Sequence, residues 1–184
     1  MGVLSLLLSF EMLGQSWFEL ANKHSPSVDA PVFDAVGVAL AGTNYLAELW
    51  GAATADSLTP LLVIDQGNRR MIVPFVSNGY FLPTAGRLCV LSVPPGGQAW
   101  LEVRAWDARL GGTYEEAVSR GIGGYGESAL FHAQGSNPFD LLGIPAALTG
   151  LESFNLRAVV PEPSAEWLFL LGAPWLFVRF RRFK

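Results

Sequence analysis

The 184-residue sequence contains one cysteine and two histidines, and these shortages exclude several kinds of chemistry. Cys89 alone cannot form an internal disulfide, a Cys-x-x-Cys redox pair or a zinc cluster. His24 and His132 lie outside the His-x-x-x-His and His-Glu pairings that hold zinc. The sequence also lacks a G-x-S-x-G motif, which would place a nucleophilic serine. We therefore expect no catalytic residues, no metal site, no cofactor and no enzymatic activity.

Charged residues are scarce as well, at 15% of the chain against about 25% in an average soluble domain. Four of the 12 cations lie within the last six positions, at Arg179, Arg181, Arg182 and Lys184. Residues 164–184 hold those four cations and one of the 16 anions, so the rest of the chain keeps 8 cations against 15 anions. An acidic body disfavours nucleic acid and anionic membrane surfaces as partners.

Hydrophobic residues make up 51% of the sequence, and the N-terminal end holds part of this excess. Residues 3–10 form an apolar stretch of the length of a signal-peptide core, far shorter than the roughly 20 residues of a membrane-spanning helix. Gly14 and Ser16 are small residues two apart, as signal peptidase requires before Trp17. Residues 1–16 are therefore predicted to be a signal peptide. A buried first strand or helix, or a wrongly assigned start, are the alternatives.

The C-terminal end has three features in a fixed order. Pro161-Glu162-Pro163 comes first, the apolar residues 165–178 follow, and the basic cluster of Arg179, Arg181, Arg182 and Lys184 comes last. This order strongly resembles the PEP-CTERM sorting signal of exported proteins of Gram-negative bacteria. The prolines keep the motif extended, as a protease substrate must be, and terminal cations stay on the cytoplasmic side of a membrane.

The resemblance implies a route for residues 159–184. An exosortase, a membrane enzyme, would cleave near Pro161 to Pro163 after residues 165–178 have entered the inner membrane as a hydrophobic helix. The body would then reach the cell surface or the extracellular space. Glu166 and Pro174 depart from the usual apolar stretch, and Pro174 would kink a helix there. An amphipathic helix with a basic end is the alternative.

Residues 17–158 alternate short β-rich runs with glycine, proline, asparagine and aspartate, a pattern typical of an antiparallel β-sandwich. The expected strands are 17–21, 45–50, 61–64, 71–75, 87–93, 99–106, 129–133 and 151–158. Thr113-Tyr114-Glu115-Glu116 has the form of a capping box, which predicts a short helix over 114–120 that ends at Gly121. The fold class is therefore mainly all-β: a single sandwich or jelly-roll-like domain with one short helix, followed by the hydrophobic sorting helix.

Several segments of this body also look like a recurring domain that precedes PEP-CTERM tails. They are Val28-Asp-Ala-Pro-Val-Phe-Asp34, Val103-Arg-Ala-Trp-Asp107, Thr113-Tyr-Glu-Glu-Ala117, Gly123-Gly-Tyr-Gly-Glu-Ser128 and Leu148-Thr-Gly-Leu-Glu-Ser-Phe154. The resemblance implies one domain but no activity.

Residues 99–106 give the clearest strand, and its two faces differ. One face is small and apolar, whereas the other presents Trp100, Glu102, Arg104 and Trp106. That second face is either open to solvent or covered by the helix after Asp107. If it is open, Trp100 and Trp106 could stack on sugar rings, with Trp50, Tyr80 and Tyr125 widening the platform and Glu102 and Arg104 binding hydroxyls. The commoner alternative is that the aromatic rings fill a core.

Three weaker patterns have simpler explanations. Residues 121–126 match G-x-G-x-x-G, but these glycines follow the predicted helix when a dinucleotide loop would open it. Asp107, Glu115 and Glu116 could pair as glycosidase carboxylates, yet a strand-end turn and first-turn helix charges account for them. Loop carboxylates without EF-hand spacing allow calcium only as an unspecific surface ligand; these are Asp29, Asp34, Asp56 and Asp65.

The sequence thus predicts an exported, non-enzymatic surface or matrix protein, anchored first in the inner membrane and associated with exopolysaccharide. The alternative is a carbohydrate-binding module that uses Trp100 and Trp106.

Overall fold

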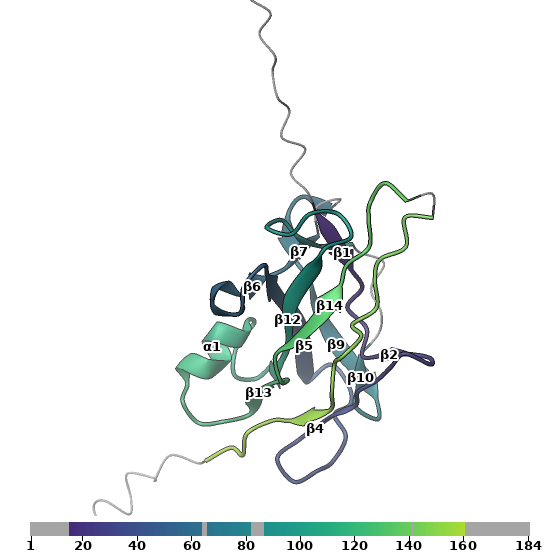
Figure 1. The fold of residues 1–184 in the computed structure, drawn as a ribbon. Coiled ribbons are helices and arrows are strands. Elements are labelled where there is room, and N and C mark those ends of the chain that lie inside the picture. The colour runs from purple at the N-terminus through teal and green to yellow at the C-terminus, as the bar shows by residue number, and fades with distance from the viewer. Residues whose placement is uncertain (1–14, 64–65, 82–86, 141, 161–184) are drawn as a thin grey trace, which may run out of the picture.

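The computed structural model describes residues 15–63, 66–81, 87–140 and 142–160, and this part of the chain is mainly β-sheet with one short α-helix (Figure 1). The strands are β1 Ser16–Phe18, β2 Lys23–His24, β3 Val28–Asp29, β4 Val32–Phe33, β5 Tyr45–Ala52, β6 Thr59–Pro60, β7 Leu62–Val63, β8 Arg69–Arg70, β9 Ile72–Ser77, β10 Tyr80–Phe81, β11 Leu88–Val90, β12 Gln98–Asp107, β13 Tyr125–Glu127, β14 Phe131–Gln134 and β15 Phe154–Asn155. The helix is α1 Tyr114–Ser119, and η1 Ala55–Ser57 is a 3₁₀ turn.

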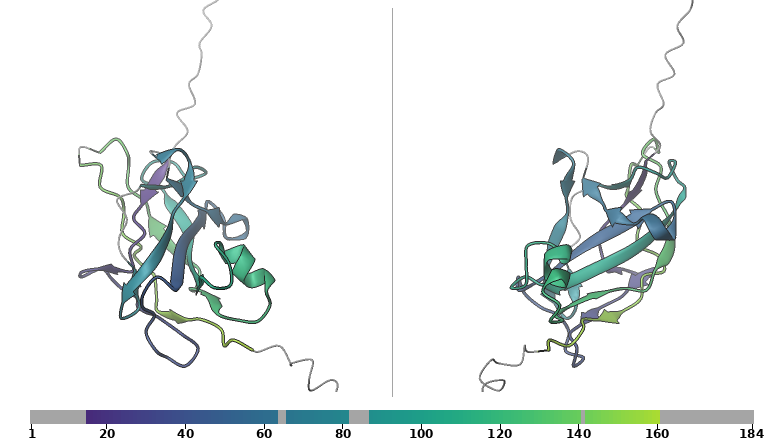
Figure 2. Two further views of the ribbon diagram at one scale, coloured as in Figure 1. Left: turned by 180° about the vertical axis from the view of Figure 1, so that it is seen from behind. Right: turned by 90° about the vertical axis from the view of Figure 1, so that its left-hand side faces the viewer.

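Two larger sheets enclose one hydrophobic core. The first has the strand order β1-β11-β7-β8, and the second has the order β10-β9-β5-β12-β13, with β14 also on β12 and β6 also on β5. The longest pairing joins β5 and β12, antiparallel from Trp100 opposite Ala52 to Asp107 opposite Tyr45. Figure 2 shows these two long strands crossing the middle of the molecule, with α1 beside them.

The expected alternation along β12 is confirmed. Ala99, Leu101, Val103 and Ala105 are all buried and face the core, where they meet residues of the opposite sheet such as Phe18, Val63 and Leu88. Burying a leucine or valine side chain fully stabilises a fold by about 1.5–3 kcal/mol relative to leaving it exposed. The inner face of β12 is therefore a main contributor to the stability of the body.

Each of the eight expected strand regions contains a strand, although several are only two or three residues long. The expected region 151–158 forms only β15, which runs parallel to β4, whereas an antiparallel pairing had been expected. The helix is confirmed at Tyr114–Ser119, and the Thr113 hydroxyl accepts a hydrogen bond from the backbone of Glu116.

The hydrophobic helix expected over residues 165–178 lies outside the described residues. Within residues 15–160, apart from the gaps given above, no helix has the length and apolar character needed to cross a bilayer.

Candidate functional site

The last described residues of the body come immediately before the predicted sorting motif in the sequence. Beyond β15, residues 157–160 run along residues 122–125, which lead into β13, and the last described residue, Val160, donates its backbone N–H to the Ile122 carbonyl at 2.7 Å. Pro161 follows directly in the sequence. The motif residues Pro161, Glu162 and Pro163 and the basic residues Arg179, Arg181, Arg182 and Lys184 all lie outside the described residues and stay predictions.

The predicted end of the signal peptide falls inside a strand. Ser16 is the first residue of β1 and is fully buried. Its hydroxyl donates to the Pro94 carbonyl at 2.6 Å and accepts from the Gly97 N–H at 3.1 Å. Cleavage after Ser16 would remove both hydrogen bonds, and the signal peptide over residues 1–16 stays a prediction.

Trp106 is buried, and this corrects the expected pair of sugar-stacking tryptophans. Its side chain is 0% exposed because α1 packs over this end of β12. The indole N–H donates to the Gly111 carbonyl at 3.0 Å, and the ring meets Tyr114 edge to face at 6.2 Å between centroids. An indole held in this way has no free face for a sugar, so Trp106 is a packing residue.

The other candidate aromatic residues do not form one platform either. Trp100 is partly buried and contacts the ring of the exposed His132 on β14. Trp50 is buried on β5, whereas Tyr80 lies on the edge strand β10, where its hydroxyl donates to Asp29 at 2.6 Å. Carbohydrate stacking between Trp100 and Trp106 is therefore not available in this fold.

The outer face of β5 and β12 is instead held by a buried charge network that sequence analysis missed. Glu48 is 1% exposed and accepts hydrogen bonds from the Trp50 indole at 2.8 Å and from Arg70 at 2.6 Å. Arg70 also binds Glu115 at 3.0 Å, so one guanidinium joins the sheet to α1. Arg104 lies over the Trp50 ring at 3.6 Å. A charged residue between Leu46 and Trp50 in an apolar strand was the available signal.

The three carboxylates considered as a glycosidase set have separate partners. The hydrogen bond from Arg109 holds the pKa of Asp107 below its ordinary value. Glu116 accepts from the Gly112 N–H at 2.7 Å at the start of α1, and Glu115 accepts from Arg70. Each carboxylate therefore stabilises a turn, a helix end or a helix-to-sheet contact, as the sequence pattern favoured.

The candidate calcium ligands do not converge. Asp29 accepts from Tyr80, Asp34 accepts from two amides of its own loop, and Asp65 lies outside the described residues. In the described part of the chain, no group of three or more histidine, cysteine, aspartate or glutamate side chains is placed to hold a metal ion.

The glycine-rich segment after α1 serves packing. Gly123 has φ +86°, and a Cβ there would overlap the Ala158 carbonyl. A Cβ on Gly126 would likewise overlap the Asn155 carbonyl. Only glycine lets the backbone of residues 155–159 come this close to the backbone of the segment. The glycines therefore serve this packing and do not form a phosphate-binding loop.

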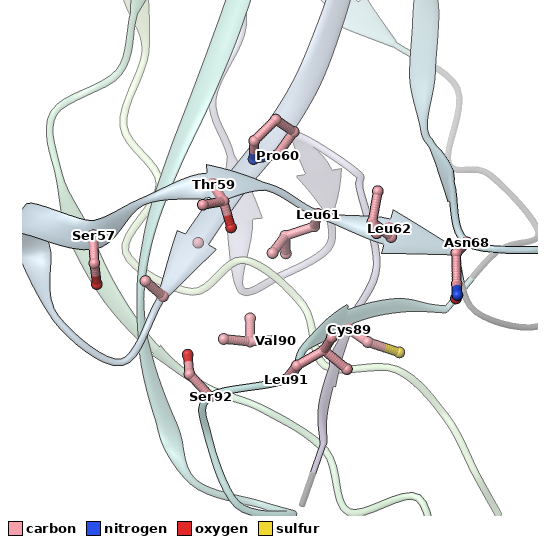
Figure 3. A pocket seen from close by; sticks show the side chains of 12 residues that line it. Ser57, Thr59, Pro60, Leu61, Leu62, Asn68, Cys89, Val90, Leu91 and Ser92 are labelled. Atoms are coloured by element: carbon pink, nitrogen blue, oxygen red, sulfur yellow. The ribbon is translucent and has the colours of Figure 1, made fainter. Parts of the chain in front are cut away.

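A pocket of about 390 Å³ opens where residues 59–63 pass from one sheet to the other. β6 pairs with β5 in the larger sheet, and β7 pairs with β11 in the smaller sheet. Leu61 lies between β6 and β7 and lines the pocket. Figure 3 shows Leu61 and Val90 on its walls and the hydroxyls of Thr59 and Ser92 toward one end. The lining has no charged side chain.

A second pocket, of about 160 Å³, lies beside the last described residues of the chain. The loop after β4 forms one side through Ala35 and Val36, and residues near the end of the described chain, such as Leu156 and Val159, form another. Two ion pairs flank it, Arg109 with Asp107 and Arg157 with Glu127. The point where the predicted sorting motif begins therefore borders a shaped and partly apolar surface.

Comparisons of the chain with protein-family models, with curated proteins and with solved structures found no match. The function is therefore argued from the chain's own residues.

Proposed function

We propose that the protein is an exported, non-enzymatic surface or extracellular-matrix protein of a Gram-negative bacterium, which an exosortase sorts through residues 159–184. The body is a β-sandwich of the jelly-roll kind, residues 165–178 are the hydrophobic sorting helix, and the released body associates with exopolysaccharide. The observation that supports this proposal is that Pro161-Glu162-Pro163 follows directly after Val160, whose backbone N–H is hydrogen-bonded to the Ile122 carbonyl.

This position suits a cleavage site. Proline has no N–H to extend the hydrogen-bonded segment that ends at Val160, and it disfavours a helical conformation at the residue before it. A protease that binds its substrate as an extended strand would meet the motif without unfolding the sheet. A cut between residues 161 and 163 would also leave every described hydrogen bond of the body in place.

The chemistry of the body agrees with a non-enzymatic role. The acids of the outer sheet face bind arginines: the buried Glu48 binds Arg70 and the partly buried Glu102 binds Arg104. The exposed Glu115 of α1 also binds Arg70. At Glu115, the desolvation that would raise the pKa is outweighed by the hydrogen bonds and the charge of Arg70, so the pKa of this carboxyl lies below its ordinary value. These groups act as a structural network in the proposal.

The test compares matched variants of the full chain in a host that has an exosortase and in the same host without it. The motif variant is Glu162→Ala with Pro163→Ala, and the control is Glu166→Ala with Pro174→Ala, which removes the same residue types outside the motif. Intact mass and cell fractionation are measured. We expect the wild type and the control to lose the tail and reach the cell surface only in the exosortase host.

The motif variant should keep the mass of its C-terminal tail and stay in the inner membrane in both hosts. Identical mass and location of the wild type and of a variant lacking residues 161–184, in the exosortase host, would overturn the proposal.

A further inference from the structure

An exposed apolar surface lies around the last described residues of the chain. Residues 35–38, in the loop after β4, are all uncharged and exposed, and Val36 is 83% exposed. Val159 and Val160, the last described residues, are exposed as well. Ala35, Val36 and Val159 line the same pocket, so the loop and the chain end are neighbours. We name residues 35–38 with Val159 and Val160 the exit face.

The N–H groups of Val36, Gly37 and Val38 have hydrogen-bond partners within this loop. The Asp34 carboxylate accepts hydrogen bonds from the N–H groups of Val36 at 2.9 Å and Val38 at 2.8 Å. The Asp34 N–H donates to the Val38 carbonyl, and the Gly37 N–H donates to the Asp34 carbonyl. Amides without partners are costly to bring out of water, and these already have partners. These three N–H groups can therefore enter a lipid interface without losing their hydrogen bonds.

The length of the tail sets the distance between the exit face and the membrane. Five residues lead from Val160 to residue 165, where the predicted hydrophobic helix begins. An extended chain spans at most about 3.3–3.6 Å per residue, so these residues reach about 17 Å. Each polar headgroup layer of a bilayer is about 5–7 Å thick. The exit face is thus the part of the body that a membrane-inserted tail brings to the lipid.

We infer that in the membrane-inserted precursor the exit face docks on the lipid bilayer, with Val36 and Val38 in the interface. This inference rests on the proposed function, because the tail supplies the tether. The contact is apolar: the body as a whole is acidic, and Arg109 and Arg157 near the exit face are paired with Asp107 and Glu127. Docking therefore does not depend on anionic lipid. It holds the motif at the membrane surface, where a membrane enzyme acts.

The test attaches an environment-sensitive fluorophore (NBD) to single cysteines of the full chain in phosphatidylcholine vesicles, in a Cys89→Ser background. Val36→Cys reports on the exit face. Leu142→Cys is the matched control, because Leu142 is 81% exposed and belongs to the loop between β14 and β15, which lies at the other end of the body (Figure 1). Leu170→Cys reports on the tail. Nitroxide-labelled lipids serve as the quencher.

The expected result is strong quenching and a blue-shifted emission at positions 36 and 170, and an emission as in water at position 142. Replacing one third of the lipid with phosphatidylglycerol should change the quenching at position 36 by less than twofold. Val38→Asp, which leaves the labelled position intact, should reduce that quenching at least threefold.

Two outcomes would overturn the inference in different ways. Quenching at position 170 with none at position 36, or with equal quenching at 36 and 142, refutes docking by the exit face and leaves the proposed function standing. Failure of position 170 to be quenched removes the membrane step of the proposed function, and the inference falls with it. Circular dichroism of each labelled variant checks that the β-sheet body is folded.

Discussion

Replacing Trp106 with alanine tests whether this residue anchors α1 or serves a ligand. The indole is 0% exposed, contacts Tyr114 edge to face and donates a hydrogen bond to Gly111. Truncating a buried phenylalanine or tryptophan to alanine costs about 3–5 kcal/mol. The substitution also removes the indole N–H that donates to the Gly111 carbonyl, and the loss of this hydrogen bond adds to the cost. We expect Trp106→Ala to lower the free energy of unfolding by about 4 kcal/mol.

The measurement is urea unfolding of the full chain, followed by far-ultraviolet circular dichroism, with Trp100→Ala as the matched control. Trp100 lies on the same face of β12 but is only partly buried, so its truncation should cost about 1–2 kcal/mol. Hydrogen exchange adds a local readout. The amides of α1 should lose protection in Trp106→Ala and keep it in Trp100→Ala, because Trp106 and not Trp100 packs under the helix.

Two results would refute this reasoning. A cost of less than about 1 kcal/mol for Trp106→Ala, with an unchanged dependence on urea, would mean that the indole does not anchor the helix. Wild-type stability combined with a loss of polysaccharide binding in Trp106→Ala would restore the aromatic platform that the buried position excludes.

Three further predictions concern other parts of the body. Glu48→Ala should lower the free energy of unfolding in urea by about 3 kcal/mol, the lower end of the range for a broken buried ion pair, because Arg70 is partly exposed. A decrease as small as that of a surface substitution would contradict the charge network. Gly123→Ala should speed hydrogen exchange at the Val160 amide, because its Cβ would push residue 158 off the sheet, whereas Gly121→Ala, with open space around its Cβ, should not. The pKa of Asp107 lies below its ordinary value of 3.8 because Arg109 binds it, so its contribution to stability is present above that pH and is lost as the pH falls through the lowered pKa. The urea midpoint of Asp107→Asn should therefore fall less steeply than that of the wild type below pH 4, and parallel curves would refute the contribution.

The elements that the sequence predicted best are those with local signals. Strict alternation over eight residues predicts β12, and a threonine followed by a glutamate three positions later predicts the start of α1. Both signals depend only on neighbours in the sequence. Strands of two residues, such as β4 and β6, show no period, and their pairing depends on partners far along the chain.

The candidate site also depends on contacts between residues far apart in the sequence, which local patterns do not predict. Alternation correctly places Trp100 and Trp106 on one face of β12, but it cannot say what covers that face. The cover comes from α1, which Arg70 ties to the sheet through Glu48 and Glu115. Arg70 and Glu115 are 45 positions apart. Whether a strand face is exposed therefore depends on tertiary contacts. Of the two tryptophans predicted to bind sugar, Trp106 is buried and Trp100 is only partly buried.

The glycine-rich segment holds the last described residues of the body. Without a side chain at Gly123 and Gly126, residues 155–159 lie directly against residues 123–126, and the Arg157 N–H reaches the Tyr125 carbonyl at 2.8 Å. The ladder of hydrogen bonds continues to Val160 and meets a proline that has no N–H to extend it. Val160, which the fold holds by a hydrogen bond, is thus directly followed by Pro161, the first residue of the predicted motif. If the proposed docking is right, a substitution that loosens the segment, such as Gly123→Ala, should lengthen the proposed tether and reduce the lipid contact of the exit face before it changes the core.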